Sequence, residues 1–320
     1  DKDLQRYIYS TQVESYHPFR LYMNELPAWD GTDRLKPLAK RISDIPLWIK
    51  SFHTWMLGLA AQWLGVTQTQ ANSVAPILIS EEQGRHKSTF CRMLMPPQLA
   101  RYYSDNLKLT AQGNPERLLA EMGLLNMDEF DKFGAQKMPL LKNLMQMSSL
   151  NICKAYQKNF RSLPRIASFI GTSNRTDLLC DPTGSRRFIC IEAEHDIDCT
   201  GIEHSQIYAQ LKEELLAGAR HWFNKEEEHA LQCHNMAYYH VNPIEDIVRN
   251  TYAPATLNES DCLSLSAAII HQELKKRFPA ALRSCTPIQL AQIFTATGIS
   301  RQHTRLGNVY LVKRVKDSEE

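Results

Sequence analysis

Among the features that this 320-residue sequence lacks is a C-x-x-C pair, although the chain contains eight cysteines. Scattered cysteines are typical of free thiols in a reducing compartment and argue against a disulfide framework. No apolar run is long enough to span a bilayer, and residues 1–20 lack the apolar stretch of a signal peptide. We therefore expect a cytoplasmic protein that has no membrane among its partners.

The sequence also lacks a large excess of positive or negative residues, and its formal net charge is only +2. Any contact with nucleic acid must therefore come from a local patch of cations. The hydrophobic fraction of 43% and the charged fraction of 22% are ordinary for a globular protein. A chain of this length fits one large domain with one or two smaller ones.

The first positive signal is an apolar run that leads into a short polar loop, in residues 74–89, VAPILISEEQGRHKST. A buried strand, a glycine-containing loop and Lys-Ser-Thr at a helix start follow the order of a phosphate-binding loop. In such a loop Lys87 would reach the outer phosphates and Ser88 would bind Mg²⁺. The residues expected to hold the nucleotide are Gln83, Gly84, Arg85, His86, Lys87, Ser88 and Thr89.

The loop departs from the usual pattern G-x-x-x-x-G-K-[ST] at both glycine positions, which hold Glu81 and His86. Glu81 places an acid near the expected phosphates, and a Cβ at His86 obstructs a tight curl of the backbone. A chance Lys-Ser-Thr at a strand–turn–helix junction is therefore an alternative that the loop alone leaves open.

Polar side chains also follow two later apolar segments. Asp128 and Glu129 come at the end of LLNMDEFD (residues 124–131), and Asn174 follows IASFIGTS (residues 166–173). Ligands bind at the carboxyl ends of parallel strands. There Asp128 would hold Mg²⁺, Glu129 would polarise the attacking water, and Asn174 would orient that water. An ordinary solvated turn is the alternative for the acidic pair taken by itself.

A pair of arginines follows a tight turn in residues 177–188, DLLCDPTGSRRF. Arg186 and Arg187 are suited to bidentate phosphate contact, including contact with the nucleotide of a neighbouring subunit. A surface salt bridge is the alternative interpretation.

Residues 132–176 contain eight lysines and arginines but no aspartate or glutamate. Within this span Tyr156 and Phe160 are interleaved with cations between two expected strands. Cations for phosphates and rings for bases predict a hairpin or loop that binds single-stranded nucleic acid. The cations expected to make this contact are Lys154, Lys158, Arg161 and Arg165. A solvated basic face is the alternative.

Together, QGRHKST, NMDEFD, TSN and DPTGSRRF resemble the ATPase domain of the virulence-associated protein E family. This family is related to superfamily 3 helicases and to the helicase halves of phage and plasmid primases. The resemblance covers about residues 15–225, and the final segment is similar to the C-terminal extension of Bacteroides-type members. It implies an ATP- and Mg²⁺-binding α/β core: a P-loop NTPase (AAA-like) parallel sheet flanked by helices.

The resemblance also implies a homo-oligomeric ring on DNA, in which Arg186 or Arg187 completes the site of a neighbouring subunit. Family members often carry a primase-polymerase domain upstream. We expect a helical N-terminal region (1–70), a P-loop ATPase core (71–225), a linker (226–260) and a small C-terminal domain (261–320). In the last region, two helices followed by a Gly307-Asn308 turn and an apolar strand predict a winged-helix-like unit.

Three functions remain open from the sequence. The first is a DNA-associated ATPase of the helicase or primase-helicase type, acting in replication of phage, plasmid or mobile-element DNA. The second is a nucleotide- or DNA-binding module whose degenerate loop does not hydrolyse ATP efficiently. The third is a structural partner of a replication or mobile-element complex that has neither activity.

Overall fold

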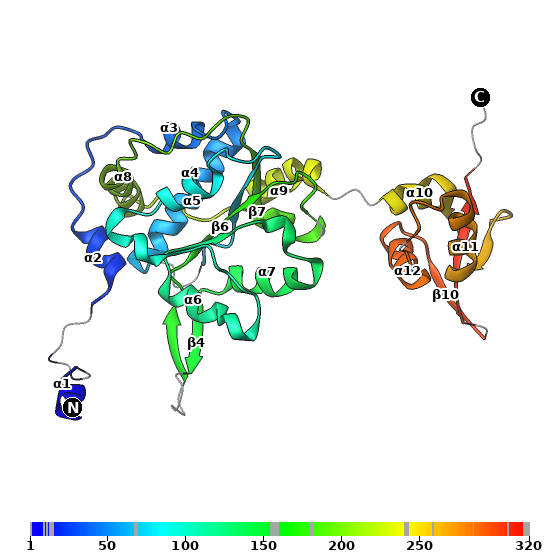
Figure 1. Ribbon diagram of the computed structural model, residues 1–320, viewed down its shortest axis with the longest axis horizontal. Coiled ribbons are helices and arrows are strands. Elements are labelled where there is room, and N and C mark those ends of the chain that lie inside the picture. Colours follow the sequence, from blue (N-terminus) through cyan, green and yellow to red (C-terminus); the bar gives the residue numbers. More distant parts are fainter. Residues whose placement is uncertain are drawn as a thin grey trace. The chain divides into compact units, whose positions relative to one another are not determined.

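The computed structural model describes residues 2–8, 10, 12, 16–66, 70–153, 160–179, 182–239, 243–257, 259–283, 285–305 and 307–315. The chain divides into two compact units, Asp1–Tyr239 and His240–Glu320, and each is described by itself (Figure 1). None of the helices in this described part of the chain combines the length and the apolar character needed to cross a bilayer.

The first unit is built on a sheet of five parallel strands. Its order is β2 (Tyr103–Ser104), β3 (Leu124–Met127), β6 (Ser168–Ser173), β1 (Ala75–Ile79) and β7 (Phe188–Glu192). Every residue of β1, β3 and β6 is buried. Such strands read as continuous apolar runs because helices cover both faces of a parallel sheet. The predicted α/β fold is confirmed.

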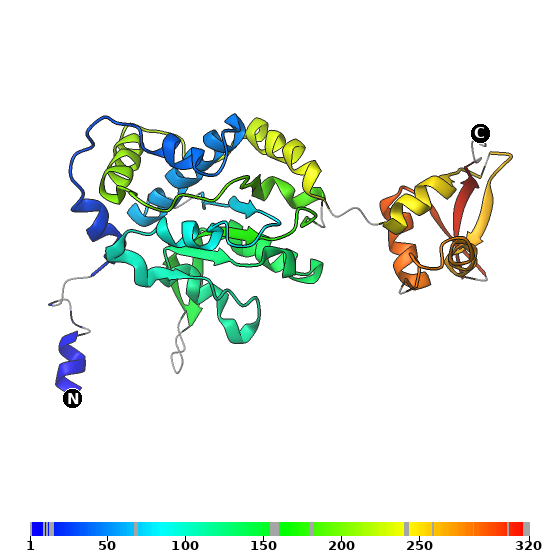
Figure 2. The same cartoon turned by 45° about the horizontal axis from the view of Figure 1, so that its top comes forward.

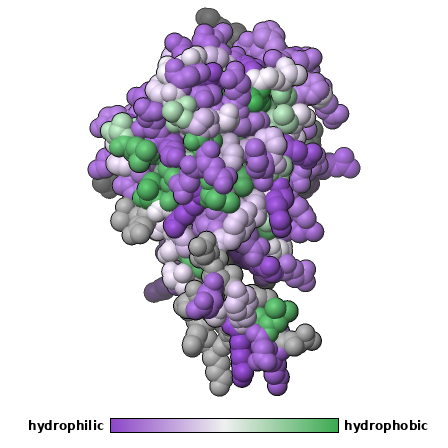
Figure 3. All heavy atoms as spheres, turned by 90° about the vertical axis from the view of Figure 1, so that its left-hand side faces the viewer, coloured by the Kyte–Doolittle hydropathy of each residue, from purple (hydrophilic) through white to green (hydrophobic). Residues whose placement is uncertain are grey.

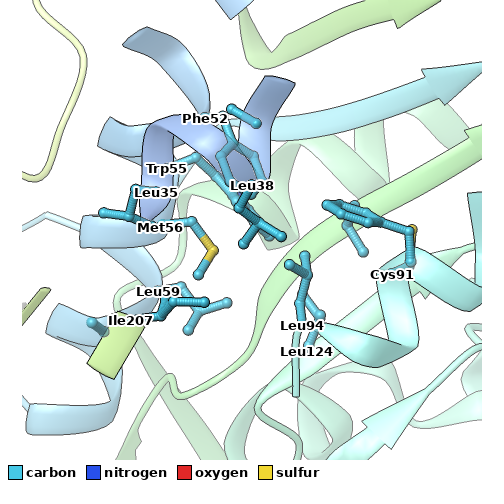
Figure 4. Close-up of a cluster of buried hydrophobic side chains, with 14 of the residues drawn as sticks. Leu35, Leu38, Phe52, Trp55, Met56, Leu59, Cys91, Leu94, Leu124 and Ile207 are labelled. Atoms are coloured by element: carbon cyan, nitrogen blue, oxygen red, sulfur yellow. The ribbon is translucent and has the colours of Figure 1, made fainter. Parts of the chain in front are cut away.

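One face of the sheet packs against α2 (Pro18–Asn24), α3 (Leu35–Lys40), α4 (Pro46–Leu64), α5 (Lys87–Met93) and α8 (His204–Leu216). Figure 4 shows side chains from α3, α4, α5 and α8 gathered over β3. Three tryptophans of α4 are at most 1% exposed, and Trp55 donates a hydrogen bond to the carbonyl of Phe169 at 3.1 Å. The N-terminal helices are therefore part of the main core.

The opposite face packs against α6 (Pro115–Glu121), α7 (Met138–Gln146) and η6 (Asn235–Tyr238). Strands β4 (Ser149–Cys153) and β5 (Phe160–Pro164) pair as an antiparallel hairpin that projects from the body (Figures 1 and 2). Helix α1 (Lys2–Ile8) precedes the body. The short helices are η1 (Pro97–Tyr102), η2 (Ala111–Gly113), η3 (Phe130–Lys132), η4 (Ala135–Lys137) and η5 (Pro182–Arg187).

Two helices occupy most of the region for which we expected a linker, residues 226–260. Helix α9 (Lys225–His234) begins at a capping box of Asn224 and Glu227, and α10 is Pro243–Thr251. The acidic run Glu226–Glu228 therefore lies in the first turn of α9, where the helix dipole favours negative charge. The unit boundary falls between these helices, at Tyr239 and His240.

The second unit has a core and a sheet of its own. After α10 come β8 (Tyr252–Pro254), β9 (Leu263–Ser266), α11 (Ala267–Arg277), α12 (Pro287–Ala296), β10 (Arg301–Thr304) and β11 (Gly307–Arg314). Strand β11 pairs antiparallel with β8, β9 and β10. A helix pair followed by a two-stranded hairpin confirms the predicted winged-helix-like unit.

Figure 3 shows one face of the molecule, on which hydrophilic side chains predominate and hydrophobic ones form small groups. Scattered apolar side chains of this kind are normal on a protein surface.

Candidate nucleotide-binding site

A cavity of about 360 Å³ lies where three neighbouring strands end. Its walls come from the loop after β1, the turn after β3 and the end of β6. The lining residues are Gln83, Gly84, Arg85, His86, Lys87, Ser88, Thr89, Asp128, Glu129, Thr172 and Asn174. All the predicted nucleotide, metal and water-positioning residues of the first three motifs thus lie around one space.

The loop before α5 depends on two residues with left-handed backbone conformations. Gly84 has φ +87° and no atom within 4 Å of the place a Cβ would take. His86, the residue before α5, has φ 60° and ψ 20°. A residue with a Cβ pays roughly 1–2 kcal/mol for this conformation, which glycine adopts freely. The backbone therefore turns sharply at Gly84 and His86, with strain at His86.

Arg85 connects the loop to the segment of the same polypeptide that follows β7. Its guanidinium forms an ion pair with Glu82 at 2.6 Å and also donates to the carbonyl of Glu194. The carbonyl of Arg85 accepts a hydrogen bond from the amide of Ile197 at 3.3 Å. Glu194 and Ile197 follow β7, so Arg85 fixes the loop to the segment after this edge strand.

Lys87 is the first residue of α5 and is only 7% exposed. Its ammonium donates to the carbonyl of Ser80 at 2.9 Å and to Oδ1 of Asn174 at 3.0 Å. Burial, followed by the nearby charge of Arg85, lowers the pKa of Lys87. Asn174 and Ser80 thus hold the cation between the ends of β1 and β6.

Asp128 accepts two hydroxyl hydrogen bonds on the same oxygen. Ser88 donates to its Oδ1 at 3.0 Å and Thr172 donates at 2.6 Å. Carboxylate and hydroxyl oxygens are ligands that Mg²⁺ accepts, so Asp128 and Ser88 form a pair of the right chemistry. Thr172 was not predicted, although it stands two residues before Asn174, near the end of β6, and both residues line the cavity.

Glu129 borders the cavity from a strained turn. Its φ is 52°, and its carboxylate forms an ion pair with Lys132 at 2.6 Å. Hydrogen bonding to Glu129 raises the pKa of Lys132. Glu81, by contrast, is exposed outside the lining of the cavity, and its carboxylate accepts a hydrogen bond from Thr176 at 3.4 Å. The acid at the first glycine position therefore does not face the space that the loop encloses.

The two predicted arginines lie away from this cavity within the same chain. Arg186 is exposed and pairs with Glu228 of α9 at 3.0 Å, and Arg187 is half-buried. Of the predicted nucleic-acid residues, Lys154 and Lys158 lie outside the described residues. The backbone of Arg161 belongs to β5, where it pairs with Ile152.

The prediction that Arg165 contacts nucleic acid is wrong, because this residue is buried and only 1% exposed. Its guanidinium donates to the carbonyls of Met145 at 2.6 Å, Ala167 at 2.7 Å and Asn72 at 3.0 Å. Burial lowers its pKa to about 9, which keeps it cationic at neutral pH. Backbone carbonyls at the end of α7 and beside β6 occupy the donors that we expected to face phosphates.

A parallel sheet with a phosphate-type loop after β1 and polar residues at the ends of β3 and β6 defines an AAA-like P-loop NTPase fold. The family model described as virulence-associated protein E-like domain matches residues 23–240. The chain belongs to this family. A second model matches residues 241–312 and is described as a domain of unknown function from B. Theta (DUF3874).

No curated protein matches the chain. Among solved structures, the chain is similar to "The apo structure of NrS-1 C terminal region (305-718)", with 15% identity and a TM-score of 0.46. That similarity covers 92% of this chain and 78% of the other. "The A form apo structure of NrS-1 C terminal region-CTR(305-718)" matches with 17% identity and a TM-score of 0.46, over 91% and 78% of the two chains.

Proposed function

We propose that this protein is a DNA-associated ATPase of the helicase type that acts in replication of phage, plasmid or mobile-element DNA. One observation carries the proposal: Lys87 at the start of α5, Asp128 after β3 and Asn174 after β6 line one cavity. A cation, a carboxylate and an amide in this order are the groups that phosphoryl transfer to water requires. ATP with Mg²⁺ would supply the phosphoryl group and neutralise its charge.

Each side chain has a defined task in this proposal. Lys87 binds the outer phosphates, Ser88 and Asp128 hold Mg²⁺, and Asn174 orients the attacking water. Glu129 accepts the proton of that water. Its ion pair with Lys132 joins side chains that are 48% and 66% exposed, so little energy is needed to release the carboxylate. In a homo-oligomeric ring, Arg186 or Arg187 would approach the nucleotide of the neighbouring subunit.

The β4–β5 hairpin is the proposed contact for single-stranded DNA. It lies between α7 and β6 in the chain, and β6 ends beside Asn174. A displacement of the hairpin on binding DNA would therefore be transmitted through β6 to the cavity. Lys154, Lys158 and Arg161 would bind phosphates there.

We expect single-stranded DNA to increase Mg²⁺-dependent ATP hydrolysis by the wild type. In the triple variant Lys154→Ala/Lys158→Ala/Arg161→Ala, this stimulation should fall at least ten-fold, because about three phosphate contacts are lost. The measurement is phosphate release with and without DNA. The matched control is Lys36→Ala/Lys40→Ala/Arg117→Ala, which removes three exposed cations from α3 and α6. Equal stimulation of both variants would refute the hairpin contact.

A nucleotide-binding module without efficient hydrolysis is the second candidate, and the strained His86 favours it. Replacing His86 by glycine should relieve the left-handed strain at the cost of backbone entropy. We expect the free energy of unfolding to rise by no more than about 1 kcal/mol and the affinity for a fluorescent ATP analogue to increase. If the native loop has lost its ligand, only the glycine variant will bind the analogue tightly.

Two controls accompany that titration. His86→Ala keeps the Cβ and should bind the analogue as the wild type does. Asn114→Gly removes left-handed strain (φ 43°) from the N-terminus of α6, outside the cavity lining, and should change stability without changing affinity. Tight wild-type binding that His86→Gly leaves unchanged would remove the case for a degenerate loop.

A further inference from the structure

The C-terminal hairpin, residues 301–314, carries positive charge without any negative charge. Its sequence contains Arg301, His303, Arg305, Lys313 and Arg314 and no aspartate or glutamate. Lys313 and Arg314 are engaged, because they pair with Glu259 at 3.0 Å and with Glu273 at 2.9 Å. Among the residues that the structure describes, neither Arg301 nor Arg305 has an acidic partner.

Arg301, His303 and Arg305 alternate along β10 and its turn, and all three side chains are exposed. Arg305 is the first residue of the turn after β10. Within β10, alternate residues such as Arg301 and His303 point to the same face and lie about 6.8 Å apart. This interval is similar to that between successive phosphates of one nucleic-acid strand. His303 lies 3.0 Å from Asn308 across the hairpin, which holds the middle of the row in register.

The hairpin is a rigid support for this row. Strand β11 pairs with β10 and β8 along one edge and with β9 along the other, because Tyr310 pairs with both Arg301 and Leu265 and Val312 pairs with both Pro254 and Leu263. Tyr310 of β11 packs against Phe294 of α12, with ring centroids 4.8 Å apart, in the core of the unit. Arg301 on this support, and Arg305 in the short turn that joins the two paired strands, can each bind a phosphate bidentately.

The neighbouring helix α12 offers little for reading bases. Residues 286–300 contain no charged side chain. Gln289 is engaged in the capping box with Thr286, and Thr295 donates to the carbonyl of Ala291 in its own helix. Gln292 is exposed and is the amide of the described part of α12 that remains, and a single amide can read at most one base pair. Direct readout in a groove needs free polar side chains on the helix that enters it. Contacts with phosphates, which carry no sequence information, are therefore what this surface provides.

Apart from the imidazole of His303, which is hydrogen-bonded to Asn308, the described part of this unit has no exposed aromatic ring on which an unstacked base could lie. Within the described part of this unit, Tyr252, Phe294 and Tyr310 are buried and Phe278 is half-buried. Binding of single strands combines cations with exposed aromatic rings on which bases stack. Cations without such rings suit a duplex, whose bases are already stacked and whose phosphates lie outside.

We infer that the C-terminal unit binds the phosphate backbone of duplex DNA through Arg301 and Arg305, without sequence preference. The choice of DNA rests on the proposed function, whereas the row of cations does not. The unit would hold duplex DNA while the β4–β5 hairpin of the first unit contacts a single strand.

The test compares the full-length chain with Arg301→Ala/Arg305→Ala, using a fluorescein-labelled duplex of random sequence and no nucleotide. Each phosphate contact contributes about 0.9 to the slope of log affinity against log salt. The wild type should bind the duplex, and its fall in affinity between about 50 and 200 mM salt should be roughly ten-fold larger than that of the variant. The matched control, Arg249→Gln/Lys275→Gln, removes two exposed cations from α10 and α11 and should keep the wild-type slope.

Several outcomes would overturn the inference: no duplex binding by the wild type, an unchanged slope in Arg301→Ala/Arg305→Ala, or tighter binding to vesicles of anionic lipid than to DNA. Circular dichroism of the variant excludes loss of folding as the cause of weak binding. Lys87→Ala separates this inference from the proposed function. It should bind duplex DNA as the wild type does even if neither protein hydrolyses ATP.

Discussion

Replacing Lys87 by alanine is expected to lower ATP hydrolysis by about 10²–10³-fold, the usual effect of removing one preorganised donor from a charged transition state. The ammonium lies at the cavity, held by Ser80 and Asn174 at 2.9 and 3.0 Å. No other cation in the described cavity lining takes its position: Arg85 is turned to Glu82 and the carbonyl of Glu194. The measurement is steady-state phosphate release, together with titration of a fluorescent ATP analogue.

Arg92→Ala is the matched control, because it removes one positive charge from the same helix. Arg92 is exposed and pairs with Asp105 at 2.9 Å, outside the lining of the cavity. It should hydrolyse ATP at close to the wild-type rate. A wild type that is no faster than Lys87→Ala would show that the cavity does not hydrolyse ATP, and equal affinities for the analogue would show that Lys87 does not bind its phosphates.

Backbone strain at the cavity is consistent with a functional site. Of the described residues other than glycine, three have a positive φ, and two of these, His86 and Glu129, border the cavity. Such conformations cost free energy and tend to persist where surrounding structure and function maintain them. His86 is the last residue before Lys87, and Glu129 directly follows Asp128. Each strained residue therefore fixes the direction in which a neighbouring polar side chain enters the cavity.

The local parts of the site could be predicted from the sequence, because each lies within one segment. An apolar run, a glycine loop and Lys-Ser-Thr define a strand, a turn and a helix without reference to the rest of the chain. The hydrogen bond from Thr172 to Asp128 could not be predicted in this way. It depends on β3 and β6 being neighbours in the sheet, although 44 positions separate the two residues.

The basic segment failed as a predictor for a different physical reason. Residues 132–176 contain no acids, but this composition predicts an anion-binding surface only when the cationic side chains are exposed to water. Backbone carbonyls can accept as many hydrogen bonds from a buried cation as carboxylates can. Because every residue has a carbonyl, the amino-acid composition does not show which cations are compensated in this way. At Arg165 the carbonyls come from the end of α7, from the segment before β1 and from the segment before β6. Only the folded chain brings these three places together.

Replacing Arg165 by alanine should therefore lower stability rather than DNA affinity. Three buried carbonyls would lose a donor at 2.6–3.0 Å, and each loss costs roughly 1–3 kcal/mol. The guanidinium also lies 5.1 Å from the ring centroid of Phe169, so a cavity would form there. Removing a buried charge recovers part of this free energy. We expect the free energy of unfolding to fall by about 3 kcal/mol, against less than about 0.5 for the exposed Arg117→Ala.

Tryptophan fluorescence in urea measures this loss in the first unit alone, because all five tryptophans precede His240. Arg165→Lys should recover little, since one ammonium cannot reach carbonyls on three sides as a planar guanidinium does. If Arg165 is buried, Arg165→Ala should have a lower urea midpoint and an unchanged affinity for single-stranded DNA. An unchanged midpoint with weakened DNA binding would instead place Arg165 on the nucleic-acid surface. The outcome matters for the site as well, because Arg165 joins the end of α7 to the segment that leads through β6 to Thr172 and Asn174.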